Sequence, residues 1–242
     1  EPALQVAQLA AVAQRDFSLG LAAAALGRAP LALAPILGEL EAAQIFRGHG
    51  FSHDLVAEAV LESLPAALVG PLHRLVADHL MSASGAAAAI AWHLDRAGDT
   101  APATAWHLKA ARLARDRWQL SEAAASFEAA ARGLEAHGAD GNETAAMAWR
   151  DAGRAWLGLA RQVNALAALE RGLASATTAR ERLRLRASRT LALHNGQQRA
   201  EAIAESLALA EELEAHLDDI DPPEQAAALF AAAIAAPYVR EP

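Results

Sequence analysis

The sequence predicts an all-α protein with one small β-hairpin. Of its 242 residues, 68 are alanine and 35 are leucine, and both types are strong helix formers. Aromatic residues, which favour strands, make up only 5% of the chain. At 54% hydrophobic residues the chain is too apolar for a disordered protein, and it is long enough to bury a core.

The placement of proline divides the chain into two regions. Six prolines fall within the first hundred or so residues, and none lies between residues 103 and 221. Because proline interrupts helices, the first region is expected to hold short helices and the second region long ones. We therefore expect a winged-helix-like domain over residues 1–82 and a helical-repeat domain over residues 83–242.

In the first region the apolar runs predict helices over residues 4–14, 19–26, 31–44, 54–63 and 65–80. Asp16 and Ser18 are candidate N-caps, and Gly27 is a candidate C-cap. Apolar residues flank the turn at residues 48–50, which indicates a β-hairpin, and His53 is expected to fix the backbone after it. Three short helices followed by a hairpin is the order of a winged helix-turn-helix.

The second region predicts antiparallel helix pairs with a tetratricopeptide-like spacing of small and large residues. After a pair over residues 86–97 and 101–114, a unit beginning at Ala146 fits this spacing at Trp149, Gly153, Trp156, Ala165, Leu169 and Gly172. A unit beginning at Thr104 fits at Ala111, Ala123, Phe127 and Ala130, with Ala114 where a large residue is expected. Small residues let two helices approach, so we expect a right-handed α-α superhelix of such hairpins.

Two further elements are expected in the C-terminal part. Residues 180–194 and 198–217 form a third pair that matches the repeat in length but not in its residues, and a last helix follows Pro222-Pro223. The arginines of residues 180–189 precede an acidic stretch over residues 201–221. Pairing of these charges between helices is favoured over a phosphate site.

The candidate site is the concave face formed by the first helix of each repeat unit. The residues expected there are Ala105, Leu108, Arg112 and Arg115 in one unit, and Met147, Arg150, Arg154 and Leu157 in the next. Four guanidinium groups on one surface of a chain with a net charge of −8 would form a local positive site suited to carboxylate or phosphate. In the alternative, these arginines pair with Asp116, Glu143 and Asp151 or are solvated.

Two segments carry a resemblance to a known family. The first runs from Phe51-Ser52-His53-Asp54 through Glu58-Ala59-Val60, Glu62-Ser63-Leu64 and Leu72-His73 to Val76-Ala77. The second contains Trp92-His93-Leu94, Ala97-Gly98-Asp99 and Ala103. Together they resemble the stretch that joins the nucleotide-binding module to the helical-repeat sensor in bacterial signal-transduction ATPases with numerous domains, the STAND class.

This resemblance implies a piece of a bacterial ATP-dependent transcriptional regulator, related to the maltose-operon activator and the antibiotic-regulatory proteins of actinomycetes. It implies a cytoplasmic location and, as partners, the missing domains of the parent protein. The sequence begins at Glu1 and contains no Gly-x4-Gly-Lys-Ser/Thr loop, so ATP is expected only in a missing nucleotide-binding domain and no cofactor in this fragment.

Several other functions are not expected. Residues 1–80 hold four basic and eight acidic side chains, and the candidate recognition helix contains Glu39 and Glu41 but no basic residue, which disfavours direct DNA binding. Cysteine is absent, and His49 and His53 do not share a helix face, so no metal site is expected. No activated nucleophile and no long apolar span is present, so neither an enzyme nor a membrane protein is expected.

The sequence thus predicts a non-catalytic regulatory fragment. The repeats would bind a protein, a peptide or a small effector on their concave face, and the winged helix would connect domains. The alternative is a helical scaffold that mediates oligomerisation or protein assembly without sensing a ligand.

Overall fold

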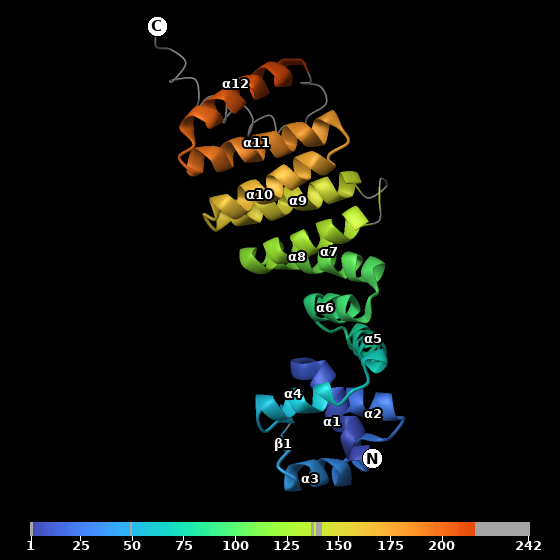
Figure 1. Ribbon diagram of the computed structural model, residues 1–242. Helices are drawn as coiled ribbons and strands as arrows, with labels where there is room; N and C mark the ends of the chain where they lie inside the picture. Colours follow the sequence, from blue (N-terminus) through green and yellow to red (C-terminus); the bar gives the residue numbers. More distant parts are fainter. Residues whose placement is uncertain (1, 49, 137, 139–141, 216–242) are drawn as a thin grey trace. The chain divides into compact units, whose positions relative to one another are not determined.

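The computed structural model describes residues 2–48, 50–136, 138 and 142–215, with side chains through residue 212 (Figure 1). The described chain is mostly helical and contains one two-stranded antiparallel sheet, which confirms an all-α protein with a small hairpin. It divides into two compact units, Glu1–Trp106 and His107–Pro242, and each is described by itself. The domain boundary expected after residue 82 coincides with the end of a helix and stays a prediction.

The first unit holds six helices, two 3-10 turns and the hairpin. These elements are α1 (Pro2–Ala13), η1 (Gln14–Asp16), α2 (Leu19–Leu26), η2 (Pro30–Leu33), α3 (Ala34–Ala42), β1 (Phe46–Arg47), β2 (Gly50–Phe51), α4 (Asp54–Glu62), α5 (Ala66–Ser82) and α6 (Ala87–Ala97). The helix expected over residues 31–44 is split, because its first turn is the 3-10 helix η2, and α3 begins beyond it.

Local capping explains where α2 begins and ends. The Ser18 hydroxyl accepts a hydrogen bond from the Leu21 backbone at 3.1 Å, and Gly27 closes the helix in the left-handed conformation at φ +60°. Two other expectations were wrong. Asp16 lies inside η1, where the chain is still turning, and the His53 side chain makes no capping hydrogen bond at the start of α4.

The core of the first unit forms where α1 packs against α3, α4 and α5. Val6 and Leu9 of α1 are buried together with Leu21, Leu40 and Val76. The hairpin is fastened to this core by aromatic rings. Buried Phe46 pairs with Phe51 across the two strands and meets it edge to face, and it meets Phe17 in the same way.

A buried pair of imidazoles joins α5 to α6. His73 Nδ1 lies 2.8 Å from His93 Nδ1, so one neutral ring must donate and the other accept. His93 Nε2 faces the Asp16 carboxylate at 3.4 Å. An arrangement consistent with both contacts places one proton on His73 Nδ1 and one on His93 Nε2. Burial lowers the pKa of His73 to about 4, with smaller contributions from His93 and Arg96.

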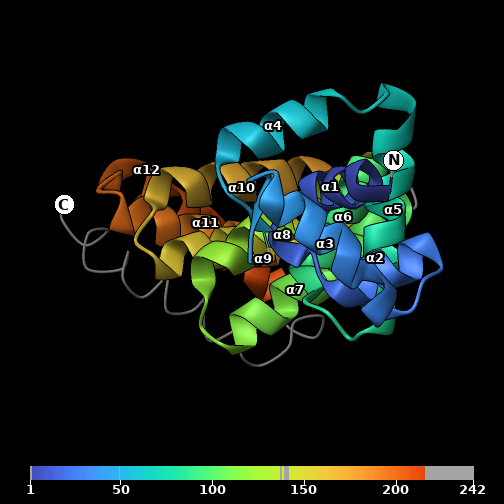
Figure 2. The same ribbon diagram turned by 90° about the horizontal axis from the view of Figure 1, so that it is seen from below.

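The second unit is a stack of long helices. It comprises the part of α7 (Thr100–Asp116) from residue 107 onward, with α8 (Leu120–Ala136), α9 (Asn142–Gly158), α10 (Gln162–Ser175), α11 (Ala179–Asn195) and α12 (Arg199–Ala215). From α8 onward each helix packs on the next, and α9 also contacts α11 (Figures 1 and 2). The helix expected after Pro222-Pro223 lies outside the described residues.

The turns α7–α8, α9–α10 and α11–α12 share one geometry. Each contains a non-glycine residue in the left-handed conformation, respectively Trp118, Ala160 and Gln197. In each turn the next residue donates its backbone N–H to the carbonyl five residues earlier, which is the Schellman closure. The left-handed conformation costs a residue with a Cβ about 1–2 kcal/mol.

These turns define three equivalent hairpins, called hairpins 1, 2 and 3 below. In each one, an alanine five residues after the left-handed residue is fully buried: Ala123, Ala165 and Ala202. Hairpin 3 therefore has the architecture of the other two, although its sequence matched them only in length. Thr190, Leu193, Ser206 and Leu209 fill its core.

Glycines permit the closest helix contacts in the second unit. A Cβ on Gly153 of α9 would lie 2.6 Å from Cγ of Leu169 on α10, and a Cβ on Gly172 of α10 would lie 2.6 Å from Cδ2 of Leu185 on α11. Both leucines are fully buried and have no room to move. The two glycines therefore set the spacing of α9, α10 and α11, as the sequence pattern predicted for small residues at these positions.

Two tryptophans tie α8 to α9. The indole nitrogen of Trp149 donates to Glu135 and that of Trp156 donates to Glu128, each at 2.7 Å. The Arg171 guanidinium of α10 lies 4.3 Å from the Trp149 ring centroid and also reaches Glu135. Trp149 thus combines a buried ring with a satisfied polar edge, which suits the large position predicted for it.

Replacing Gly153 with alanine is expected to lower the free energy of unfolding by about 1–3 kcal/mol, because the new methyl group overlaps Leu169. Urea denaturation measures this change. The matched control is Gly38→Ala in α3, where a Cβ meets nothing within 4 Å, and it is expected to stabilise the protein by about 0.5–1 kcal/mol. Equal effects of the two substitutions would contradict the close approach.

The stability of the protein is expected to fall as the pH drops from about 6.5 to about 4. The folded pKa of His73 lies below its ordinary value of 6.5, so the unfolded chain binds the proton more readily within this window. Above that window the contribution of the neutral ring is fully present. An NMR titration of the His73 ring protons tests the assignment directly, and a folded pKa at or above 6.5 would contradict it.

Candidate functional site

The candidate surface is the face formed by the first helices of the hairpins, α7, α9 and α11. Of the residues expected there, Arg112, Arg115, Met147 and Arg154 are exposed, whereas Leu157 is half-buried and Arg150 is buried. The four arginines also differ in their partners. Among the residues that the structure describes, neighbouring carboxylates bind Arg115 and Arg150 but not Arg112 and Arg154.

Arg150 is bound within the protein. Its Nη1 donates to both carboxylate oxygens of Glu181 on α11 at 2.8 Å, and Glu181 is only 2% exposed. Arg184 approaches the same carboxylate at 3.5 Å. Burial raises the pKa of Glu181, and Arg150 and Arg184 offset only part of that shift. Arg150 is therefore a structural residue between hairpins 2 and 3 and is not free to bind a ligand.

Arg115 is also occupied. Its guanidinium contacts Asp116 at 3.3 Å and Asp151 of α9 at 3.6 Å. Asp151 in turn lies 3.5 Å from Nη2 of Arg150. A chain of alternating charges therefore crosses α7, α9 and α11, and we call it the ion chain: Arg115, Asp151, Arg150, Glu181 and Arg184. The expected alternative, pairing with Asp116 and Asp151, holds for Arg115, and Arg150 shares Asp151.

Glu143, considered as a further partner for these arginines, has a different role. Its carboxylate accepts hydrogen bonds from the backbone and the hydroxyl of both Thr177 and Thr178, at the start of α11. Burial raises the pKa of Glu143, but these four hydrogen bonds lower it further, to about 2. The ionised carboxylate fixes the turn between hairpins 2 and 3.

Arg112 and Arg154 remain available. They occupy equivalent places in α7 and α9, both side chains are exposed, and neither forms an ion pair with any residue that the structure describes. Packed helices lie about 8–10 Å apart, so guanidinium groups on adjacent helices can reach one ligand. Exposed Met147 and half-buried Leu157 add apolar surface near them.

One residue of this surface was missed from the sequence. Leu191 of α11 occupies the place in hairpin 3 that Arg112 and Arg154 hold in hairpins 1 and 2, and it is 39% exposed. Aligning hairpin 3 with hairpin 2 by the equivalent alanines Ala165 and Ala202 would have placed Leu191 at the position of Arg154. At this one place the surface is therefore basic on hairpins 1 and 2 and apolar on hairpin 3.

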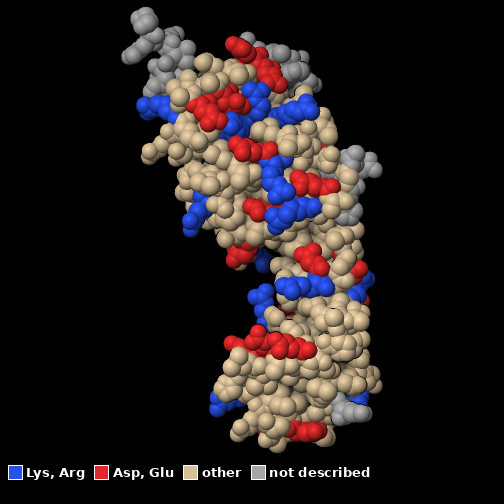
Figure 3. Space-filling model, viewed as in Figure 1, with Lys and Arg blue, Asp and Glu red and all other residues tan. Residues whose placement is uncertain are grey.

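Two arginines of the second basic run, Arg186 and Arg189, pair with carboxylates of the next helix as expected. Arg186 of α11 pairs with Glu205 at 2.7 Å and with Glu212, and Arg189 pairs with Glu201 at 2.5 Å. Figure 3 shows acidic and basic side chains interleaved over the second unit. The acidic residues beyond 215 lie outside the described part. This pairing leaves α11 no phosphate site built from these two arginines.

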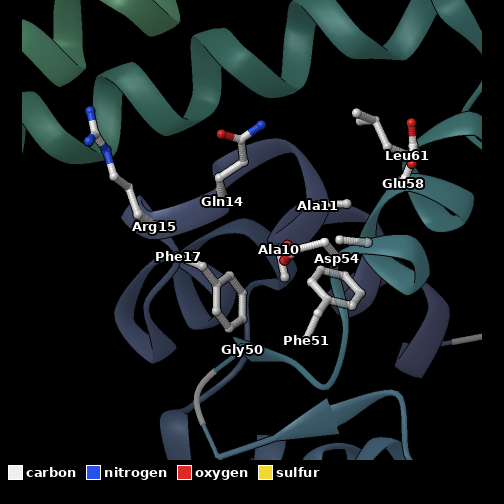
Figure 4. A pocket seen from close by; sticks show the side chains of 11 residues that line it. Ala10, Ala11, Gln14, Arg15, Phe17, Gly50, Phe51, Asp54, Glu58 and Leu61 are labelled. Carbon is white, nitrogen blue, oxygen red and sulfur yellow. The ribbon is translucent and has the colours of Figure 1, made fainter.

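The first unit contains a pocket of about 600 Å³ between η1, β2 and α4 (Figure 4). Phe17 and Phe51 form part of its wall, and Arg15, Asp54 and Glu58 lie around it. All three charged side chains are exposed. No buried polar group points to a specific ligand there, so the pocket is weaker evidence for a site than the hairpin face.

Among the residues that the structure describes, no three His, Asp or Glu side chains gather as a metal site. In the same part of the chain, no single helix has the length and apolar character needed to cross a membrane. Two pairs of consecutive helices have this length and character only when both helices of the bent pair are taken together. Comparison with protein-family models, curated proteins and solved structures found no match to this chain.

Removing the Arg150 guanidinium is expected to be far more costly than removing that of Arg115. Arg150→Met leaves the buried Glu181 carboxylate without its closest partner, which costs about 3–5 kcal/mol, whereas Arg115→Met at an exposed pair costs at most about 1 kcal/mol. Urea denaturation measures both. The double variant Arg150→Met/Glu181→Leu should recover most of the loss. Equal costs for the two single variants would contradict the assignment.

Proposed function

We propose that this chain is a non-catalytic regulatory module whose hairpin face binds a ligand that carries carboxylate or phosphate groups. In this proposal hairpins 1–3 belong to a right-handed, tetratricopeptide-like superhelix, and the ligand is a protein segment, a peptide or a small effector. Residues 1–82 form a winged helix that connects domains. The parent protein is a bacterial transcriptional regulator with an ATP-binding domain outside this chain, as the resemblance implies.

The observation that carries the proposal is that the four arginines predicted for one face differ in whether a carboxylate binds them. Arg115 and Arg150 are bound by carboxylates of the ion chain, but Arg112 and Arg154 have no partner among the described residues. Exposed guanidinium groups beside apolar side chains suit ligands that combine an acidic group with an apolar part. The ion chain links the same helices, α7, α9 and α11, and so reduces the entropy cost of binding.

Regulation follows if the bound ligand favours one arrangement of the parent protein over another. A ligand shifts such an equilibrium only by its difference in affinity for the two states. A charged ligand that contacts both α7 and α9 can differ in affinity between two states if the spacing of these helices differs. Any change in that spacing also alters the contact between Arg115 and Asp151. Sensing in this form requires no chemistry from the chain itself.

The ion chain also supports the second candidate function, a scaffold for assembly. Five charged side chains that satisfy one another across three hairpins make a rigid surface with little residual charge. If Arg112 and Arg154 merely solvate that surface, the module organises other domains without sensing a ligand. The two functions differ in whether a small acidic ligand stabilises the protein.

The test is a thermal-shift screen of acidic peptides, phosphorylated sugars, nucleotides and dicarboxylates against the wild type and the Arg112→Glu/Arg154→Glu variant. A ligand at about 100 times its Kd stabilises the folded state by about 2.7 kcal/mol. The proposal expects at least one such ligand whose effect disappears in the variant.

The matched control is Arg28→Glu/Arg182→Glu. It makes the same change in net charge at two exposed arginines that are not among the residues assigned to the face under test, and it should keep the ligand response. A response lost equally in both variants would indicate a general charge effect and contradict ligand binding on the hairpin face. If no ligand in the screen stabilises the wild type, the scaffold is the better account.

A further inference from the structure

Trp118 combines two features that oppose folding. It lies in the α7–α8 turn at φ +59°, a conformation that disfavours any residue with a Cβ, and its side chain is 83% exposed. An exposed indole contributes little burial to the core, and a glycine at this place would relieve the backbone. The fold therefore gives no reason for tryptophan here, and such a residue is a candidate for function.

The surface around Trp118 is apolar and basic. The first turn of α10 exposes Val163, 81% accessible, and Leu159 is 38% exposed at the end of α9. The α7–α8 and α9–α10 turns are neighbours, because a Cβ on Gly158 would lie 2.7 Å from Cδ1 of Leu120. Figure 1 shows both turns on the same side of the helix stack.

Two arginines complete this surface. Arg117 and Arg161 are exposed, and among the residues that the structure describes neither has an ion pair or a side-chain hydrogen bond. Two exposed carboxylates lie close to them in the sequence, and each has another interaction. Asp116 contacts Arg115, and Glu122 lies in the first turn of α8, where an acidic group favours the helix N-terminus. We call the surface of Arg117, Trp118, Leu159, Arg161 and Val163 the turn edge.

We infer that the turn edge is a docking site for a segment of a partner protein in which acidic residues flank an apolar side chain. Trp118 and Val163 supply the apolar contact, and Arg117 and Arg161 match carboxylates on either side of it. Tryptophan and arginine are the side chains that most often dominate the energy of protein interfaces. The positive charge selects an acidic partner and rejects a basic one.

The turn edge is separate from the proposed ligand face. The face is built from side chains along α7, α9 and α11, whereas the turn edge is built from the ends of helices and the turns between them. The two sites therefore make independent predictions. Loss of one leaves the other to be tested by its own variants.

The test uses a phage-displayed library of random twelve-residue peptides selected against the immobilised full chain. Enriched peptides are expected to contain an apolar residue flanked by aspartate or glutamate. Synthetic copies are then titrated by fluorescence anisotropy against the wild type and against Trp118→Gly and Arg161→Glu. Each substitution should weaken binding by at least about tenfold.

Trp118→Gly gives a second readout that a merely structural role would not produce. Because glycine accepts the left-handed conformation, the variant should melt about 2–4 °C higher than the wild type while it binds the peptide more weakly. Gln197→Gly is the matched control. It relieves the same conformation in hairpin 3, away from the residues of the turn edge, and it should raise the melting temperature and leave peptide binding unchanged.

Three results would overturn the inference. These are a selection that enriches no peptide or enriches basic ones, peptide binding that survives Trp118→Gly, and Trp118→Gly that lowers the melting temperature. Peptides whose binding depends on Arg112 and Arg154 instead of Trp118 and Arg161 would support the proposed ligand face and count against the turn edge.

Discussion

The close approach of α9, α10 and α11 determines most of the second unit. Gly153 and Gly172 leave no room for a side chain, so Leu169 and Leu185 pack directly against helix backbone. At that spacing a long side chain on α9 that faces α11 is largely removed from water. Arg150 stands at such a place, and its charge is tolerated only because Glu181 meets it there. Helix spacing thus decides which arginines are structural.

The same constraint explains why charge patterning alone did not identify the site. From the sequence, Arg112, Arg115, Arg150 and Arg154 are equivalent, because spacing places all four on one face. Their roles diverge through tertiary partners, since Asp151 lies within reach of both Arg115 and Arg150, while Glu181 comes from a helix 31 residues further along the chain. Such long-range pairing has no signal in helical periodicity. The identity of the two available arginines therefore required the structure.

Local signals, by contrast, were sufficient for much of the fold. Ser18 and Gly27 set the limits of α2 as expected, because an N-cap and a left-handed C-terminal glycine act within one turn of the helix. Hairpin 3 was predicted from the lengths of its helices but not from the repeat residues, because Thr190 and Ser206 occupy buried places where the repeat pattern has other residue types. Its turn geometry and the buried Ala202 show instead that it is equivalent to hairpins 1 and 2. Backbone geometry was retained in this hairpin while side-chain identity was not.

Equivalence between hairpins also separates residues that serve the fold from residues that serve something else. Ala123, Ala165 and Ala202 are the same residue at the same buried place, which is what a shared packing requirement produces. The three left-handed turn residues share a conformation but differ in type: tryptophan, alanine and glutamine. The conformation therefore demands no particular side chain, and packing does not select the exposed indole of Trp118. A large apolar side chain at a strained and exposed place is best explained by a contact outside the unit.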